Sequence, residues 1–186
     1  MKTIPFSLVL LLTGEFAMGA FLPVCERTEA IQKELEVLVK KPCGEMTEAD
    51  LAAIKRVAVP ERGVSVLKAE DFSGMPNLEI INLIGNPLER LPEGLTKELR
   101  NLRTFAMFDT PIRFLPHDFL EGNEKMENLH IFANGNLKSL SVSMLSRLEA
   151  MQNLKVLDFD KALNEPERIR LRTRFPEGGP VELTFF

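Results

Sequence analysis

Residues 77–92 of the chain read NLEIINLIGNPLERLP, and this stretch decides the fold. It fills the frame Leu-x-x-Leu-x-Leu-x-x-Asn-x-Leu-x-x-Leu, with Leu78 at the first position and Asn86 at the polar one. The frame returns 24 residues later and also occurs 24 residues earlier. These copies consist of Leu102, Phe105, Met107, Thr110, Ile112 and Leu115, and of Ile54, Val57, Val59, Arg62, Val64 and Leu67. A constant period predicts a repeat protein in which each copy buries its apolar residues against its neighbours.

Two more copies are less regular. One alignment places Leu129 with Leu102 and leaves that copy two residues short. The other places Leu129 and Ile131 at the second and third apolar positions and Asn134 at the polar one, with one residue inserted before Leu137. Both alignments remain open from the sequence. The last copy has Leu154, Leu157 and Phe159 and then loses the frame. A second marker opens four copies: Asn77-Leu78, Asn101-Leu102, Asn128-Leu129 and Asn153-Leu154.

With this frame, residues 51–163 resemble the leucine-rich-repeat family. The resemblance implies an α/β fold, a right-handed solenoid with a parallel β-sheet on its concave face and helices on its convex face. It also implies that the Asn86 side chain satisfies backbone groups where the strand turns away. Arg62 and Thr110 depart from this position, so we expect their turns to be less regular.

The outer segments between strands differ in length. Leu67 to Leu78 and Leu91 to Leu102 each span eleven positions, whereas Leu115 to Leu129 and Leu140 to Leu154 each span fourteen. Three extra residues make nearly one helical turn. In the last segment the apolar residues recur at helical spacing, which predicts a helix there. These residues are Met144, Leu145, Leu148 and Met151.

The two ends of the chain are expected to cap the repeats, residues 21–50 with helices and residues 164–186 as a C-terminal cap. An amphipathic helix is predicted over residues 26–40, with a stripe of Ile31, Leu35, Leu38 and Val39. Thr47 is the expected N-cap of a second helix. Residues 165–175 carry both helix and strand signals, and a helix is favoured. Residues 181–186 predict a last strand.

The first twenty residues, 1–20, predict a signal peptide, with Lys2, an apolar run and a small-residue cleavage site after Gly19 or Ala20. In an oxidising compartment Cys25 and Cys43 are expected to form a disulfide, the alternative being two reduced thiols. No glycosylation sequon is present. We therefore expect an exported protein, periplasmic or secreted, of a Gram-negative bacterium. No stable membrane insertion is expected, because the apolar run is far shorter than the ~20 residues of a spanning helix.

Composition and motifs favour binding over catalysis. A net charge of -4 argues against nucleic acid as a partner. Motifs for nucleophilic catalysis, phosphate binding and zinc binding are absent, so we expect no enzyme, no cofactor and no metal. His117 is interpreted as a surface residue. Asp158 and Asp160 are interpreted as a solvated pair rather than a calcium site.

The concave face is the predicted binding surface. Its side chains are read from the residues that flank the repeat leucines, and they are apolar for a solvent-facing sheet. The predicted contact residues are Ile80, Asn82, Ile84, Thr104, Ala106, Phe108, His130 and Ile131. The expected function is an exported, non-catalytic module that recognises a protein or peptide. The alternatives are a structural or self-associating envelope protein, including a homodimer, and binding of an anionic envelope polymer by Arg168, Arg170, Arg172 and Arg174.

Overall fold

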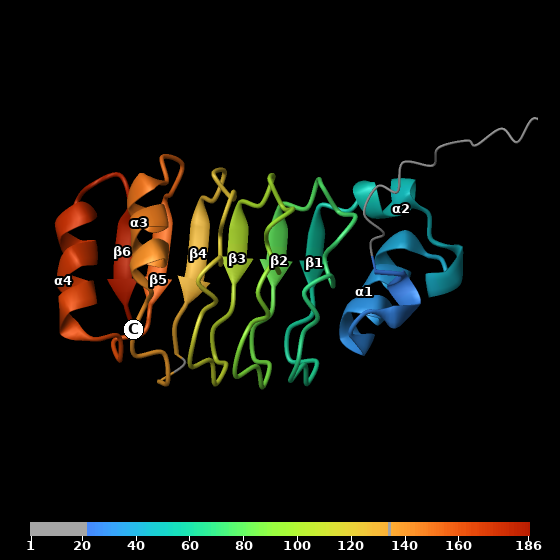
Figure 1. The fold of residues 1–186 in the computed structure, drawn as a ribbon, viewed down its shortest axis with the longest axis horizontal. Helices are drawn as coiled ribbons and strands as arrows, with labels where there is room; N and C mark the ends of the chain where they lie inside the picture. Colours follow the sequence, from blue (N-terminus) through green and yellow to red (C-terminus); the bar gives the residue numbers. More distant parts are fainter. Residues whose placement is uncertain (1–21, 134) are drawn as a thin grey trace, which may run out of the picture.

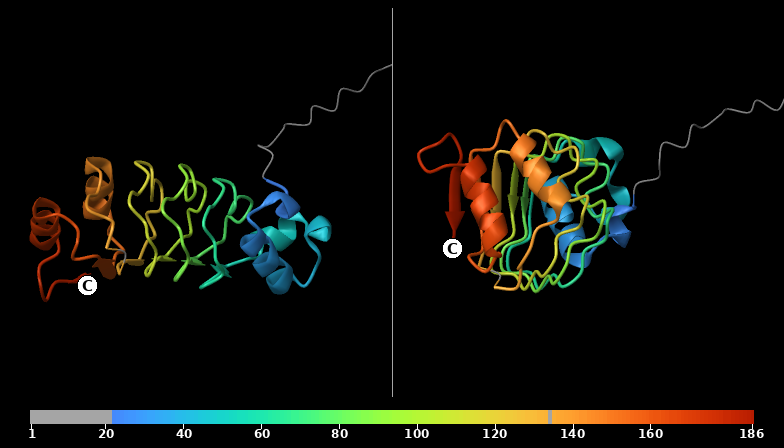
Figure 2. Two further views of the ribbon diagram at one scale, coloured as in Figure 1. Left: turned by 90° about the horizontal axis from the view of Figure 1, so that it is seen from below. Right: turned by 60° about the vertical axis from the view of Figure 1, so that its left-hand side comes forward.

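The structure, a computed structural model, describes residues 22–133 and 135–186. The predicted signal peptide lies outside the described residues. Six short strands form one parallel sheet in chain order (Figure 1). Figure 2 shows this sheet along one side of an elongated solenoid. The strands are β1 (Arg56–Ala58), β2 (Ile80–Asn82), β3 (Thr104–Ala106), β4 (Asn128–Ile131), β5 (Val156–Phe159) and β6 (Glu182–Phe185). The predicted α/β solenoid is confirmed.

The second apolar position of each repeat forms a buried column inside the solenoid. Strand pairing aligns Val57 with Ile81, Ile81 with Phe105, and Phe105 with Leu129, each partner lying one repeat further along the chain. Leu157 continues the column after a longer repeat. All five side chains are fully buried. The repeats therefore pack as predicted, each against its neighbours.

The pairing of β3 with β4 decides the alignment around Leu129. Because Leu129 pairs with Phe105, it takes the second apolar position, as the second of the two alignments predicts. Met126, three residues earlier, is buried at the first position. The segment before Leu129 therefore has no extra residues, and the expectation of a longer segment there is wrong. The extra residues of the irregular copies lie between Leu129 and Leu157.

The Asn86 side chain joins two repeats at the strand exit. Its Oδ1 accepts from the Arg62 and Val64 amides at 3.1 and 3.0 Å. Its Nδ2 donates to the carbonyls of Val59 and Leu83, both at 2.8 Å. In four copies the residue before this position has a left-handed backbone conformation. These residues are Glu61, Gly85, Asp109 and Ala133. Glu61 and Asp109, which precede Arg62 and Thr110, thus have the same backbone conformation as Gly85 before Asn86. The less regular turns expected at Arg62 and Thr110 are not seen at these two residues.

The Asn-Leu marker has a structural cause in three of its four occurrences. The side-chain amides of Asn77, Asn101 and Asn153 donate to backbone carbonyls of the preceding repeat, at 2.9, 2.9 and 3.0 Å. Asn128 differs: it lies within β4 and donates to the Thr104 hydroxyl at 3.1 Å. The interpretation of Asn128-Leu129 as a fourth marker is wrong, because the two residues have a different register.

The convex side is built mostly from turns. The segments before β2, β3 and β4 contain turns rather than the helices expected on this face. Of the segments that join β1 to β5, the one before β5 does form a helix, α3 (Val142–Ala150). Its N-cap hydroxyl, Ser141 Oγ, accepts from the Met144 amide. Its buried residues include Met144, Leu145 and Leu148, as predicted. The extra residues of this repeat supply the length that a helix needs.

Short helices pack at the N-terminal end of the sheet. They are η1 (Val24–Glu26), α1 (Glu29–Val39), η2 (Cys43–Glu45) and α2 (Glu48–Ala52). A Cys25–Cys43 disulfide joins η1 to η2, as predicted. Thr47 and Asp50 form a reciprocal capping box at the start of α2. In α1, Ile31 and Leu35 are buried, but Leu38 is exposed and does not belong to the buried stripe.

A buried polar network fastens these helices to the first repeat. The Arg27 guanidinium donates to the carbonyls of Asp71 and Ser73, at 2.7 and 2.8 Å. The Asp71 carboxylate accepts from the Thr28 amide and hydroxyl at 2.8 and 2.6 Å. Burial lowers the pKa of Arg27 to about 10, against the attraction of Asp71. Arg27 therefore keeps its charge at neutral pH.

At the other end, residues 165–174 form a helix and not a strand. Helix α4 (Glu165–Arg174) begins after Asn164, whose side chain accepts from the Glu167 amide at 3.3 Å. It packs against α3, and the chain then returns as β6 beside β5. The predicted last strand is confirmed.

Replacing Asn86 by Ala should destabilise the fold strongly. The buried groups of two repeats lose a shared partner, and we expect the free energy of unfolding to fall by about 3 kcal/mol. Urea denaturation followed by circular dichroism measures this. Asn136→Ala is the matched control, because Asn136 is exposed. Equal urea midpoints for the two variants would contradict the role of Asn86.

The Asp50 carboxylate of the capping box should make the stability of the fold depend on pH in the acidic range. Hydrogen bonds from Lys41 and Thr47 lower the pKa of Asp50 to about 2. Because this pKa is below its unfolded value, the box stabilises the fold above about pH 4 and loses this effect as pH falls toward 2. In Asp50→Asn the melting temperature should change less over this range than in the parent chain. An unchanged pH slope would contradict the assignment.

Candidate functional site: the concave face

Each strand, together with the one or two residues that follow it, places three side chains on the concave face. Successive side chains of a strand alternate between faces, so every second residue points away from the core. Backbone hydrogen bonds extend the register beyond the strand ends. We number the resulting columns along the strand. Column 1 is Arg56, Ile80, Thr104, Asn128, Val156 and Glu182; column 2 is Ala58, Asn82, Ala106, His130, Asp158 and Thr184; column 3 is Pro60, Ile84, Phe108, Phe132, Asp160 and Phe186.

Seven of the eight predicted contact residues lie in these columns, and Ile131 does not. Ile131 pairs with Phe159, and both side chains are fully buried in the core. The prediction assigns it to the concave face because it reads this copy one residue out of phase, and a shift of one residue exchanges the two faces of a strand. His130 and Phe132, on either side of Ile131, belong to the concave face. Ala133 lies in the turn that follows Phe132.

Four apolar side chains of column 3 form a continuous row. We call Ile84, Phe108, Phe132 and Phe186 the apolar row. The ring of Phe132 stacks on Phe108 with centroids 4.6 Å apart and on Phe186 with centroids 4.3 Å apart. Phe186 is 50% exposed, and the other three are partly exposed. Sequence reasoning missed Phe132 and Phe186, although counting one regular repeat onward from Phe108 finds Phe132.

Column 2 beside this row is mostly polar, with Ala58 and Ala106 as its two apolar members. The His130 Nδ1 lies 2.6 Å from the Asp158 Oδ2. Asp160 accepts from the Gly135 amide at 2.6 Å and the Ala162 amide at 2.7 Å. Asp158 and Asp160 are both buried, so the prediction of a solvated pair is wrong. Within residues 22–133 and 135–186, His, Cys, Asp and Glu side chains form no group of three suited to a metal ion.

Comparisons with known proteins agree on the architecture. No protein family model matches the sequence, and no curated protein is similar to it. A leucine-rich-repeat protein from Leptospira interrogans is similar in structure over 76% of this chain, with 22% identity and a TM-score of 0.58. Internalin C2 from Listeria monocytogenes is similar over 88%, with 15% identity and a TM-score of 0.55. This chain spans 34% of the Leptospira protein and 79% of the internalin.

The chain has the leucine-rich-repeat fold.

Opposite charges alternate along one margin of the leucine-rich-repeat sheet. The residues just before column 1 are Lys55, Glu79, Arg103, Glu127 and Lys155. Lys55 lies 3.2 Å from Glu79, and Lys155 lies 2.6 Å from Glu127, which also pairs with Arg103. Hydrogen bonds from Lys155 and Arg103 lower the pKa of Glu127. The margin therefore joins neighbouring repeats and carries little net charge.

The arginines of α4 are used within the C-terminal part of the fold. Arg170 binds both carboxylate oxygens of Glu149 in α3, at 2.5 and 2.8 Å. Arg168 pairs with Glu165. Arg172 and Arg174 lie over the rings of Phe185 and Phe175, 5.1 and 5.4 Å from their centroids. The cluster predicted as an anion site therefore has internal partners for every guanidinium.

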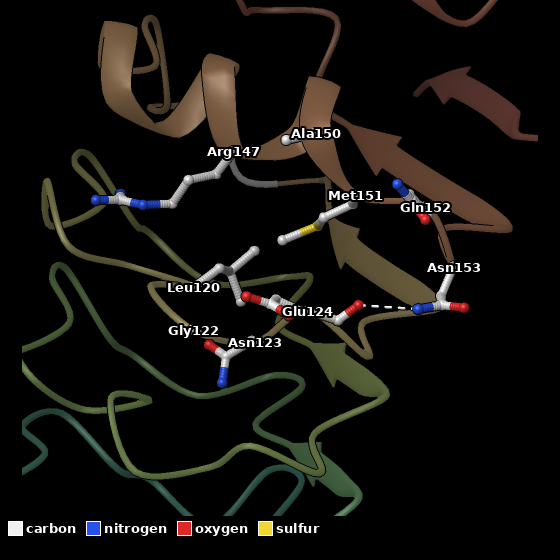
Figure 3. Close-up of a pocket in the computed structure, with 9 residues that line it drawn as sticks. All are labelled: Leu120, Gly122, Asn123, Glu124, Arg147, Ala150, Met151, Gln152 and Asn153. Carbon is white, nitrogen blue, oxygen red and sulfur yellow. Dashed lines mark hydrogen bonds between the residues drawn. The ribbon is translucent and has the colours of Figure 1, made fainter.

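A hollow of about 430 Å³ lies on the convex side, where the turn-built repeats meet α3 (Figure 3). Leu120, Met151, Arg147 and Glu124 are among the residues that line it (Figure 3). Arg147 already donates to the carbonyls of His117 and Phe119. The hollow arises because a helix replaces a turn in the next repeat. It lies away from the concave face.

The His130–Asp158 contact should fix the tautomer of the imidazole. An ionised carboxylate only accepts hydrogen bonds, so the neutral ring must carry its proton on Nδ1. The imidazole ¹⁵N shifts should show a protonated Nδ1 in the parent chain and a protonated Nε2 in Asp158→Ala. Thr184→Ala, in the same column, is the control and should keep the parent pattern. If the parent chain and Asp158→Ala show the same tautomer of His130, the contact is contradicted.

Proposed function

We propose that this chain is an exported, non-catalytic recognition module that binds a protein or peptide on its concave face. The observation that carries the proposal is the apolar row. Its four side chains point away from the core and remain partly exposed. In Figure 2 the described helices lie behind the sheet or at the ends of the solenoid, and none of them crosses the open face of the sheet.

The energetics of a solvent-facing sheet support this interpretation. Side chains on the outer face do not contribute to the core, so core packing does not require Ile or Phe there. Exposed contiguous apolar surface typically marks an interaction site. Burial of such surface contributes roughly 25 cal/mol per Å² to association before the entropic costs of binding. Aromatic side chains at the centre of an interface contribute most.

Export is the second part of the proposal. The Cys25–Cys43 disulfide is the kind of bond that persists in oxidising compartments and is rare in the cytosol. No helix in the described part of the chain is long and apolar enough to cross a membrane. We assign the protein to the periplasm or the extracellular space on the basis of the disulfide and the predicted signal peptide.

The non-catalytic part rests on the sequence, which lacks the motifs of nucleophilic and metal-dependent catalysis. A repeat scaffold by itself does not determine a ligand. The partner is therefore assigned by chemistry only, as a protein surface or peptide with apolar side chains.

Phe108→Arg should abolish partner capture while the fold survives. A charged side chain in the middle of the apolar row cannot be buried against an apolar partner, and we expect capture to fall roughly thirtyfold, equivalent to about 2 kcal/mol. The measurement is affinity capture from envelope or host-cell extracts, followed by quantitative mass spectrometry. Gln152→Arg, at an exposed position on the convex side, is the control for added charge.

Undiminished capture by folded Phe108→Arg would contradict the proposal. Light scattering at several concentrations distinguishes the self-associating alternative. A concentration-dependent dimer that is lost in Phe108→Arg would assign the row to contacts between copies of this chain.

A further inference from the structure

The spacing of the apolar row restricts the shape of its partner. The row crosses the strands and runs along the solenoid axis. Its ring-to-ring steps are 4.6 and 4.3 Å, and the step from Ile84 to Phe108 is one strand spacing, about 4.8 Å. The four side chains together span about 14 Å.

An α-helix matches this spacing better than an extended peptide. Side chains on one face of a helix recur every turn, about 5.4 Å along the axis. Over the three steps of the row, the mismatch grows to only about 2.5 Å. In a β-strand, side chains on one face recur every ~6.7 Å, and the mismatch reaches about 6 Å, more than one full step. About nine or ten helical residues cover the row at 1.5 Å per residue.

The flatness of the sheet agrees with a straight partner. Seen from below in Figure 2, the strands lie in a nearly straight line along the solenoid. A straight helix can therefore contact Ile84 at one end of the row and Phe186 at the other. The apolar row is one side chain wide, and column 2 beside it is mostly polar and has no large apolar side chain, so the partner needs only one apolar stripe.

Two of the three charged residues at the turn position directly after column 3 are acidic. Glu61 and Asp109 are exposed in the turns on one side of the row, at the position directly after column 3. Asp158, on the other side in column 2, is buried against His130 and adds little to this exposed charge. Lys161, which follows β5, is the one cation at that turn position in the described residues. Lysine or arginine next to the apolar stripe of a partner would complement this pattern.

We infer that the partner element is a basic amphipathic α-helix of about ten residues that lies along the apolar row, across the strands. This inference rests on the proposed function and adds the conformation, direction and charge of the ligand. Apolar residues at i, i+3 or i+4, and i+7 of the helix contact the row.

Two phage-displayed peptide libraries test the inference on the full folded chain. One library displays random faces on a rigid single-helix scaffold, and the other displays linear peptides of the same length. The helical library is expected to yield binders with the i, i+3/i+4, i+7 apolar pattern and a net positive charge. Their affinity should fall at least tenfold in Phe132→Arg and change less than threefold in Asn128→Arg, which places the same charge in column 1 of the same strand.

Amide and methyl NMR shifts in the parent chain provide a test that does not depend on the folding of a variant. Binders should shift the signals of Ile84, Phe108, Phe132 and Phe186 together. If Phe132-dependent binders come only from the linear library, the helix inference fails and the proposed function stands. If neither library yields binders that shift the row, both fail. Enrichment of acidic helices would overturn the charge assignment.

Discussion

The structure depends on one constraint: the second apolar side chain of each repeat must lie directly beside its counterpart in the next repeat. Val57, Ile81, Phe105, Leu129 and Leu157 meet this constraint, and water reaches none of them. A repeat alone leaves this side chain half exposed, so its stability comes from its neighbours. Because strand side chains alternate, fixing one buried column also fixes which residues face outward. The concave face is therefore a consequence of the core register.

The same constraint explains where the chain tolerates changes in length. The first three steps between paired strands have the same length and the fourth is longer, yet the sheet continues without interruption. The extra residues lie between strands, mainly on the convex side, where α3 takes the place of a turn. A longer outer segment adds its own buried residues, such as Met144 and Leu148, and does not displace the strands. The hollow beside α3 is the local result of this change in thickness.

Local patterns in the sequence predicted much of the fold. The repeat frame, the Asn86 position, the Thr47 cap, helices α1, α3 and α4 and the last strand all depend on residues close in sequence. The register at Leu129 could not be decided in this way, because Asn128-Leu129 imitates a marker and Met126 replaces the usual leucine. Only the pairing with Phe105 separates the two alignments. The Arg27–Asp71 network was missed for a related reason, since its partners are far apart in the sequence. No local pattern links them.

On the concave face, too, local patterns predicted some features, while contacts between distant residues decided the others. Alternation placed most of its residues, but the phase error at Ile131 hid Phe132, and the stacking of Phe132 with Phe186 joins two strands that are not neighbours. The two rings meet beside β5, where Asp160 directs its carboxylate to the amides of Gly135 and Ala162. The Asp160 carboxylate holds the turn after β4. The rings of Phe132 and Phe186, on either side of position 160, stack on each other and complete the row. The exposed side chains of the row are not required by the packing of the core, and the proposed function rests on this property.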